Sequence, residues 1–399
     1  MSLVDHAIWW HVYPLGATGA PIRGAADAVH RLPQLENWLD YVVELGCSGL
    51  LMGPVFRSTS HGYDTLDHVA IDPRLGTEED FDHLVAAARA RGLAIMLDGV
   101  FNHVGAQHPM VSDPGSPIRC VDGRPVGWEG HDDLVLLDHG DPRTADLVVD
   151  CMLHWLRRGI AGWRLDVAYA VPSWFWRAVT DRVRREFPDA VFLGEVIHGD
   201  YAGIAEEGGL DSVTAYELWK ATWSAIADRN FWELSWALER HGRFSAAHVL
   251  QTFVGNHDVS RIASLVGDDG AVLALVVLMT TPGMPSVYYG DEQGFRGENG
   301  SGEWADDPLR PSLPETPEGL APYGWWLYRV HQDLIGLRRR HPWVTRGRVR
   351  VVAKDLTWIT YETSRDGHTM RVELRLEPVP CVSITVDGSD AYGWERRSR

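Results

Sequence analysis

Residues 162–168, with the sequence Gly-Trp-Arg-Leu-Asp-Val-Ala, contain a charged pair inside a run that is otherwise apolar and strand-like. Arg164 and Asp166 are two residues apart, so in a strand their side chains project to the same side. Burying a guanidinium with a carboxylate is costly unless that carboxylate must stay ionised, as a nucleophile must. We therefore expect a buried strand on which Arg164 orients Asp166 and keeps its pKa low.

Two further apolar runs lead to carboxylates in the same manner. Residues 191–194 are followed by Glu195, and residues 253–257 are followed by Asp258. Three carboxylates at the carboxyl ends of separate strands are typical of a barrel enzyme, whose catalytic groups lie at that end. Glu195 ends an apolar strand beside other carboxylates, which should raise its pKa and let it keep a proton.

Strand and helix patterns alternate through most of the chain, as a parallel α/β fold requires. Amphipathic stretches with helical spacing lie between the strands, at residues 35–45, 79–90, 144–157 and 173–185. The strands that we predict lie at residues 8–13, 49–52, 94–97, 162–166, 191–195, 212–216, 249–253 and 286–288. Eight such strands predict a (β/α)8 TIM barrel, which can absorb most of the 399 residues.

Two segments fall outside the predicted barrel, which we assign to residues 1–103 and 142–342. The Gly/Pro/Asp/His-rich stretch at 104–141 is longer than ordinary loops, so we predict a short functional lobe inserted after the third strand. Residues 343–399 follow a predicted helix at 325–340 and alternate in strand fashion. They predict a small carboxyl-terminal antiparallel β domain.

Composition excludes several classes of partner. The formal net charge of -18 argues against nucleic acid and against an anionic membrane surface, and it suits a neutral ligand. The chain holds 18 Trp, whose flat apolar rings with one polar handle stack well on sugar faces. The best apolar segment, residues 271–279, is too short to span a bilayer.

The cysteines and the amino terminus bear on the compartment. Four scattered cysteines without a Cys-x-x-Cys pair support neither a zinc site nor a redox motif, so we expect free thiols. Residues 1–6 lack the basic segment and the long apolar core of a secretory signal. We therefore expect a cytoplasmic enzyme that is a monomer or a small homo-oligomer.

Together with residues 98–103, Asp-Gly-Val-Phe-Asn-His, these segments resemble the four conserved regions of the α-amylase family of glycoside hydrolases, in order and spacing. Residues 61–64, His-Gly-Tyr-Asp, and the Pro-Gly-Met-Pro run that begins at 282 add to the resemblance, which covers roughly residues 7–342. The sequences of residues 162–168 and 101–103 are similar to those of cyclomaltodextrinase/neopullulanase-like enzymes, which act on short α-glucans.

The resemblance implies a role for each matching residue. Asp166 would be the nucleophile, Glu195 the general acid and base, and Asp258 would bind sugar hydroxyls and favour the transition state, with His257 beside it as a donor. Further positions follow by the same carry-over: His103 contacts the same sugar, Tyr63 stacks beneath it, Asp64 and Arg310 meet from the loops after strands two and eight to bind the non-reducing sugar, and Asp98 and Asn102 give structural support.

No cofactor is expected, and no metal site is assigned. Asn102 is either a calcium ligand, as in many α-amylases, or a turn residue. Many α-amylases carry Lys-His where this chain has Tyr169 and Ala170, and the first loop, residues 14–23, lacks the Asp/Asn-rich calcium-binding pattern of some relatives. A structural calcium ion is therefore compatible with the sequence but not favoured.

The function that these residues favour is a retaining α-glucosidic hydrolase. It would cleave α-1,4 or α-1,6 bonds in short linear or cyclic maltooligosaccharides through a covalent glycosyl-Asp intermediate. A transglycosylase or sugar isomerase, such as a glucanotransferase or a trehalose synthase-like enzyme, would use the same intermediate, and the motifs do not separate these. The remote alternative is a non-catalytic binding barrel, like the ectodomains of amino-acid transporter heavy chains. Such barrels usually lack the catalytic carboxylates and carry a membrane anchor, whereas this chain keeps all three carboxylates.

Overall fold

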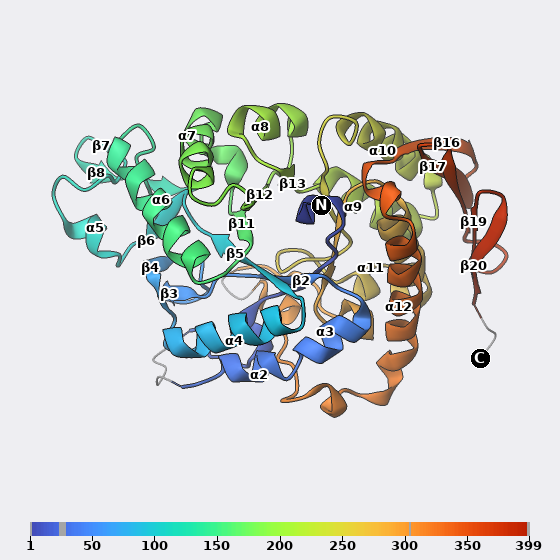
Figure 1. Ribbon diagram of the computed structural model, residues 1–399, viewed down its shortest axis with the longest axis horizontal. Helices are drawn as coiled ribbons and strands as arrows, with labels where there is room; N and C mark the ends of the chain where they lie inside the picture. Colours follow the sequence, from blue (N-terminus) through green and yellow to red (C-terminus); the bar gives the residue numbers. More distant parts are fainter. Residues whose placement is uncertain (1, 24–28, 303–304, 397–399) are drawn as a thin grey trace.

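The computed structural model describes residues 2–23, 29–302 and 305–396, and a closed ring of parallel strands lies at its centre (Figure 1). Eight strands form one sheet in the order β13-β12-β11-β5-β2-β1-β15-β14, and a parallel bridge between Thr214 and Gln251 joins its two ends. The strands are β1 (Trp9–Val12), β2 (Gly49–Met52), β5 (Ala94–Gly99), β11 (Gly162–Leu165), β12 (Val191–Gly194), β13 (Ser212–Val213), β14 (Gln251–Phe253) and β15 (Met284–Tyr288). The predicted TIM barrel is confirmed.

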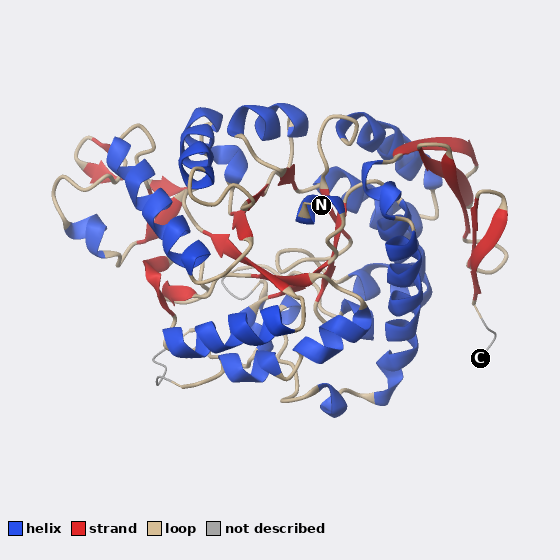
Figure 2. Cartoon of the chain, viewed as in Figure 1, coloured by secondary structure: helices blue, strands red, loops and turns tan. Residues whose placement is uncertain are grey.

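Helices surround this ring, as Figure 2 shows. Those longer than one turn are α2 (Leu32–Glu36), α3 (Leu39–Leu45), α4 (Glu78–Ala90), α6 (Pro142–Arg157), α7 (Ser173–Arg184), α8 (Tyr201–Gly208), α9 (Tyr216–Ala227), α10 (Phe231–Phe244), α11 (Ile262–Thr280) and α12 (Trp325–Arg340). Local signals start several of them. The helix α4 begins at a capping box formed by Thr77 and Asp80. The helix α6 begins at Pro142, and the carboxylate of the preceding Asp141 accepts a hydrogen bond from the backbone N–H of Arg143.

The side chains inside the barrel change from apolar to polar along the strands. Near the amino ends a buried cluster fills the interior, and it includes Trp9, Met96 and Leu193. His11, Asp98 and Glu195 follow two residues later along the same three chain segments, so they face the same side. The carboxyl end of the barrel is therefore the polar end, where enzymes of this fold carry their sites.

One glycine lets the catalytic strand approach its neighbour closely. Gly162 begins β11, and a Cβ added there would lie 2.1 Å from the carbonyl oxygen of Val191. A larger residue would push β11 away from β12. The two strands carry Asp166 and Glu195 at their ends, so the glycine sets the spacing of these two carboxylates.

The segment after β5 forms a small lobe at one end of the molecule's long axis (Figure 1). It contains β6 (His103–Gly105), the short α5 (Pro109–Ser112), β7 (Cys120–Val121), β8 (Arg124–Pro125), β9 (Gly127–Trp128) and β10 (His131–Leu136). Strands β6, β10 and β9 make an antiparallel sheet over its own apolar cluster, which includes Val104 and Val135. A separate hairpin follows β2, formed by β3 (Phe56–Ser58) and β4 (Thr65–Ile71).

A five-stranded antiparallel sheet lies at the opposite end of the long axis (Figure 1). Its strands, in chain and spatial order, are β16 (Arg348–Lys354), β17 (Trp358–Arg365), β18 (His368–Arg375), β19 (Cys381–Val386) and β20 (Ser389–Glu395). The predicted carboxyl-terminal β domain is thus confirmed as antiparallel, although its last predicted residues, 397–399, lie outside the described residues.

Several boundaries differ from those predicted. The sixth strand ends at Val213 rather than at residue 216, because Tyr216 already begins α9. The helix predicted at 35–45 is two helices, α2 and α3, that are separated at residues 37–38. Two helices, α9 and α10, stand between β13 and β14 where one would complete the repeat.

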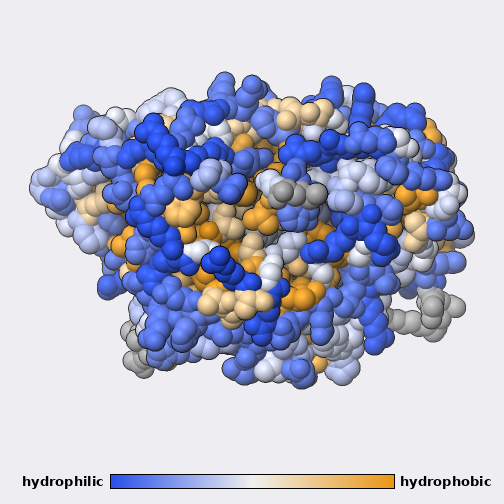
Figure 3. Space-filling view, in the orientation of Figure 1, coloured by the Kyte–Doolittle hydropathy of each residue, from blue (hydrophilic) through white to orange (hydrophobic). Residues whose placement is uncertain are grey.

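The longest apolar helix was underestimated from the sequence. The helix α11 has 19 residues and is long and apolar enough to cross a membrane, although 67% of its most apolar 18-residue stretch is buried inside the fold. Gly267 interrupts its helical backbone with φ +70 and ψ 176. Burial of this kind is typical of a core helix in a large barrel. Figure 3 shows that hydrophilic side chains dominate the outer edge of the face turned to the viewer.

Candidate active site

One guanidinium holds three carboxylates together at the carboxyl end of the barrel. Arg164 Nη1 lies 2.7 Å from Asp98 Oδ2 and 2.9 Å from Asp166 Oδ1, and its Nη2 lies 2.7 Å from Glu195 Oε1. All four side chains are at most 7% exposed. The strands β5, β11 and β12 are neighbours in the sheet, which brings these residues together although they are 97 residues apart along the chain at most.

The electrostatics of this cluster differ from the prediction for Asp166. Burial raises its pKa well above the ordinary value; Arg164 opposes this effect, and the neighbouring Glu195 and Asp98 add to it. Burial likewise raises the pKa of Asp98 to about 6. The expectation that Arg164 keeps the pKa of Asp166 low is therefore wrong, because one positive charge is shared among three buried carboxylates.

Two donors position the carboxylate of Glu195 from different elements. The backbone N–H of Val167 donates to Oε2 over 2.9 Å, and the hydroxyl of Tyr216, at the start of α9, donates to Oε1 over 3.2 Å. Asn256 Nδ2 donates to the same Tyr216 hydroxyl over 2.9 Å, and Asn256 Oδ1 accepts from the backbone N–H of Asp258. A chain of hydrogen bonds thus runs from Asp258 to Glu195.

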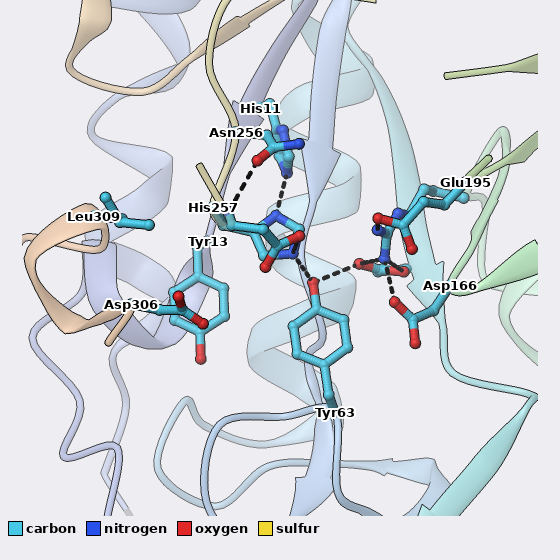
Figure 4. A network of polar contacts seen from close by, with 12 residues as sticks. His11, Tyr13, Tyr63, Asp166, Glu195, Asn256, His257, Asp306 and Leu309 are labelled. Atoms are coloured by element: carbon cyan, nitrogen blue, oxygen red, sulfur yellow. Dashed lines mark hydrogen bonds and ion pairs between the residues drawn. The ribbon is translucent and has the colours of Figure 1, made fainter. Parts of the chain in front are cut away.

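Tyr63 stands at the centre of the site, between His257 and the side of the barrel that carries Asp166 (Figure 4). Its hydroxyl donates to Asp98 Oδ2 over 3.0 Å and also contacts His257 Nε2. Its ring is stacked on that of His257, with centroids 5.3 Å apart. His257 Nδ1 in turn lies 3.3 Å from His11 Nε2 on the first barrel strand. The two motifs that hold Tyr63 and His257 are therefore brought into one contact.

Asp258 is the carboxylate with a free face. Its side chain is 37% exposed, whereas its partner His257 is buried and lies 3.0 Å away through Nε2. Burial holds the pKa of His257 well below its ordinary value, and Arg164 and Arg310 add to this effect. His257 is thus neutral near neutral pH, and it leaves part of the Asp258 side chain exposed.

Arg310 reaches the same carboxylate from the loop after β15. Its Nη2 lies 3.3 Å from Asp258 Oδ1 and 2.9 Å from Asp306 Oδ2, and its Nε donates to the carbonyl of His257. The guanidinium also lies 4.6 Å above the ring of Tyr13. Arg310 is 8% exposed, so it is part of the site and not a solvated loop residue.

The predicted pairing of Asp64 with Arg310 is wrong. Asp64 is buried, and its carboxylate accepts from the backbone N–H and the hydroxyl of Ser60, at 3.1 and 2.7 Å. Within the described part of the chain, the ion pairs of Arg310 are those with Asp258 and Asp306. The acidic residue Asp306 lies four positions before Arg310 and competes successfully for its guanidinium.

A fully buried arginine fixes the loop that carries Arg310. Arg261 has no exposed surface; its Nη1 donates to the carbonyl of Tyr289 and to Asp291 Oδ1, and its Nη2 donates to the carbonyl of Leu309, all within 2.9 Å. The last of these bonds holds the residue immediately before Arg310. The position of Arg310 therefore depends on the buried guanidinium of Arg261.

His103 and Asn102 form a local pair beneath the inserted lobe. Asn102 Nδ2 donates to His103 Nδ1, and His103 Nε2 donates to the carbonyl of Tyr63, each over 3.1 Å. Trp128 of β9 is stacked with His103 at 6.4 Å between centroids. Both ring nitrogens of His103 are thus engaged by protein, and its contact with a sugar stays a prediction.

Several participating residues were not predicted as site residues, and Asp306 is one of them. Asn256 lay inside the quoted motif at 253–258, so its position was available, whereas Tyr216, His11 and Tyr13 are ordinary strand and helix residues with no local signal. Only the folded barrel brings them to the carboxylates. Within residues 2–23, 29–302 and 305–396, no group of three or more His, Cys, Asp or Glu is arranged to hold a metal ion.

Comparisons with known proteins identify the family of the chain. The family model described as "Alpha amylase, catalytic domain" matches residues 27–117 and 130–310. The chain is 34% identical over 361 residues to "Neopullulanase 2" of Thermoactinomyces vulgaris, covering 83% of this chain and 58% of the relative. It is 32% identical over 286 residues to "Intracellular maltogenic amylase" of Bacillus subtilis, covering 65% of this chain and 48% of the relative. The chain therefore spans about half of the length of these curated relatives.

A solved structure supports the fold over the whole length. The ligand-free "Cyclic alpha-maltosyl-(1-->6)-maltose hydrolase" from Arthrobacter globiformis is similar with a TM-score of 0.81 at 23% identity, and all of both chains is covered. The family model covers more than half of the chain and includes all three carboxylates of the site. The chain belongs to the alpha-amylase family of glycoside hydrolases.

Proposed function

We propose that this protein is a retaining α-glucosidic hydrolase acting on short α-glucans. The observation that carries the proposal is the bridging of Asp166 and Glu195 by the single guanidinium of Arg164. Because the two nitrogens of one guanidinium are close together, the two carboxylates lie on one side of a small space. Retaining glycosidases need their two carboxyl groups about 5–5.5 Å apart, whereas inverting ones need room for a water molecule between substrate and base.

The reaction follows from the two roles. Asp166 attacks the anomeric carbon and forms a glycosyl ester while Glu195 gives its proton to the departing oxygen. A water molecule then attacks the anomeric carbon and gives a proton back to Glu195, while the bond from that carbon to the Asp166 oxygen breaks and Asp166 leaves as a carboxylate. The excess of negative charge around Arg164 favours the retention of one proton in the cluster, which general acid catalysis requires.

Asp258 and its partners would bind the sugar at the cleavage point. Arg310 and neutral His257 orient the half-exposed carboxylate of Asp258, which leaves an oxygen face for sugar hydroxyls and for the positive charge that develops in the transition state. Tyr63 offers a ring face beside it. Asp64 directly follows Tyr63 in the chain, and we assign it to the same sugar-binding region.

The substrate class and compartment are part of the proposal. Relatives named for pullulan and for maltogenic action at 34% and 32% identity support short α-glucans with 1,4 or 1,6 bonds, and a neutral oligosaccharide suits the net charge of -18. The name "Intracellular maltogenic amylase" and the four free cysteines, of which Cys120 is exposed, support action inside the cell. The three carboxylates would act without a metal ion.

Chromatography of products from a substrate panel tests the proposal. The panel holds maltotriose, panose, cyclodextrins, branched cyclic sugars, starch, trehalose and sucrose, each with and without an acceptor sugar. We expect glucose or maltose from the short α-glucans without added acceptor. A disaccharide of unchanged mass would instead identify an isomerase, and longer products that need the acceptor would identify a transferase. No product from any α-glucan would contradict the proposal.

A further inference from the structure

A pocket lies close to the proposed general acid and shares Tyr216 with the catalytic cluster. It has a volume of about 610 Å³ and lies between the segment that follows Glu195, residues 197–199, and the paired helices α9 and α10. The side chains that matter below are those of Tyr216, Trp219, Lys220, Trp236 and Arg240. None of these residues belongs to the motifs that carry the catalytic assignment.

The floor of this pocket is aromatic. Tyr216 and Trp219 stand three residues apart on α9, so they share one face of the helix, and their rings meet edge to face at 5.8 Å. Trp223 continues the row with a centroid distance of 6.1 Å from Trp219. Trp236 faces the same pocket from α10 and is 65% exposed, the most exposed tryptophan in the described part of the chain. An indole this open to water has a free ring face on which a ligand can stack.

The rim of the pocket carries charged groups held in place by each other. Lys220 Nζ lies 2.8 Å from Glu233 Oε1, and Arg240 Nε lies 2.5 Å from Glu217 Oε1. Each pair joins α9 to α10 at an edge of the aromatic floor. Flat apolar rings with fixed polar donors and acceptors around them match a sugar, whose ring faces are apolar and whose edge carries hydroxyls.

The pocket and the catalytic cluster have Tyr216 in common. This residue lines the pocket, and its hydroxyl donates to Glu195 Oε1 over 3.2 Å. Ile197, also in the lining, follows Glu195 by two residues. The pocket is thus on the side of the general acid, where the departing part of the substrate must lie when Glu195 protonates it.

We propose that this pocket binds glucosyl units of the departing part of an α-glucan, with Trp236 and Trp219 as the stacking residues. The proposal rests on the proposed function and adds to it the length of substrate that the enzyme prefers. Binding energy gained there would hold longer chains in register over the cleavage point. It would also hold an acceptor sugar after the first step and so raise the ratio of transfer to hydrolysis.

Trp232 supplies a matched control. It is on the same helix as Trp236, one turn earlier, and is 53% exposed. Its ring is covered by Lys354, whose Nζ lies 4.8 Å from the ring centroid, and it does not line the pocket. Trp232→Ala therefore removes an exposed indole from α10 without touching the proposed sugar contact.

The test compares Trp236→Ala and Trp232→Ala with maltoheptaose and with p-nitrophenyl α-maltoside. For Trp236→Ala we expect kcat/KM for maltoheptaose to fall about tenfold, through KM, with a smaller loss for the short substrate; this is the size of one aromatic stacking contact. Trp232→Ala should behave as wild type with both substrates. Equal losses for the two substrates, or no loss for maltoheptaose, would overturn the proposal while activity on the short substrate still supported the hydrolase.

A binding measurement separates this proposal from the reaction itself. Maltoheptaose is titrated by calorimetry into Asp166→Asn and into Asp166→Asn combined with Trp236→Ala. Weaker binding by the double variant supports the pocket even if the wild type turns over neither substrate, an outcome that would overturn only the hydrolase. Unchanged binding overturns the pocket. A shift in the oligomeric state on substituting Trp236, with unchanged sugar binding, would show that a second copy of the chain covers this indole.

Discussion

The backbone N–H of Val167 donates a hydrogen bond of 2.9 Å to Oε2 of Glu195. To do so Val167 adopts a left-handed conformation, with φ +49 and ψ +37. A β-branched residue rarely adopts this conformation, which costs about 1–3 kcal/mol. Because Val167 directly follows Asp166, this strained turn links the backbone beside the proposed nucleophile to the proposed acid. The two carboxylates are thereby fixed relative to each other by backbone as well as by Arg164.

Substitution of either central carboxylate should abolish turnover. Asp166→Asn and Glu195→Gln each remove a role that the other residue does not fill, so we expect kcat on the best short substrate to fall by roughly a thousandfold or more. Circular dichroism melting should show that both variants stay folded. Activity within about tenfold of wild type in either variant, after deamidation and contamination are excluded by mass spectrometry, would contradict the assignment.

The first product released should keep the α configuration. Attack by Asp166 and then by water inverts the anomeric carbon twice, and the net result is retention. Proton NMR during the first minutes of hydrolysis, before mutarotation, distinguishes the anomeric signals. An initial β-anomer would mean that water attacks the substrate directly, and Asp166 would then be a base.

The acid limb of the pH profile should respond to Asp98. Asp166 must be ionised to attack, so kcat/KM falls as the pH drops through its pKa, which burial and the neighbouring carboxylates raise. Asp98→Asn removes one of those negative charges and leaves more of Arg164 for Asp166, so the limb should move to lower pH. Asp181→Asn, at an exposed position on α7, serves as the control. A limb that stays in place or moves to higher pH would show that Asp166 does not govern it.

Arg310 should be coupled to Asp306 rather than to Asp64. The guanidinium contacts Asp306 at 2.9 Å, so in a double-mutant cycle on kcat/KM the paired variants Arg310→Ala and Asp306→Ala should show a coupling energy of about 1 kcal/mol. Each single variant should lower kcat/KM, because Arg310 also holds Asp258. Strictly additive effects of Arg310 and Asp306, together with strong coupling between Arg310 and Asp64, would restore the pairing that the structure replaces.

Chelation should leave the chemistry intact. The proposed steps use carboxylates and a guanidinium, and the residues that replace the calcium-linked Lys-His pair, Tyr169 and Ala170, are poor ligands for calcium. We expect equal initial rates after exhaustive treatment with EDTA and after readdition of calcium. The matched measurement is the melting temperature under the same two conditions. Activity lost in chelator and restored by calcium alone would make a metal part of the active state.

Local sequence patterns predicted most of the barrel and the residues at its strand ends. Asp166 and Glu195 each follow an apolar run by a fixed spacing, and strand alternation alone places them on the inner face. The ion-pair partner of Arg310 was mispredicted, because the ion pair of a loop residue depends on the local conformation of the loop. Here that conformation brings Asp306, four residues earlier, to 2.9 Å from the guanidinium. The pKa of Asp166 was mispredicted for a related reason, since pairwise spacing shows one guanidinium but not how many carboxylates share it.

The closure of the barrel has a mechanical consequence. Seven of the eight seams in the ring are ladders of paired strands, but the eighth, between β13 and β14, is a single bridge from Thr214 to Gln251. The backbone N–H of Ala215 donates across this seam to the carbonyl of Gln251 over 2.9 Å, whereas the side chains of Thr214 and Gln251 bond to Val196 and Ser286 on the other side of each end strand. This seam therefore has the least backbone pairing in the ring, and it lies beside the helix α9, which begins at Tyr216. Because local opening is favoured where backbone pairing is sparse, we expect the barrel to open first at this seam, beside the helix that carries Tyr216.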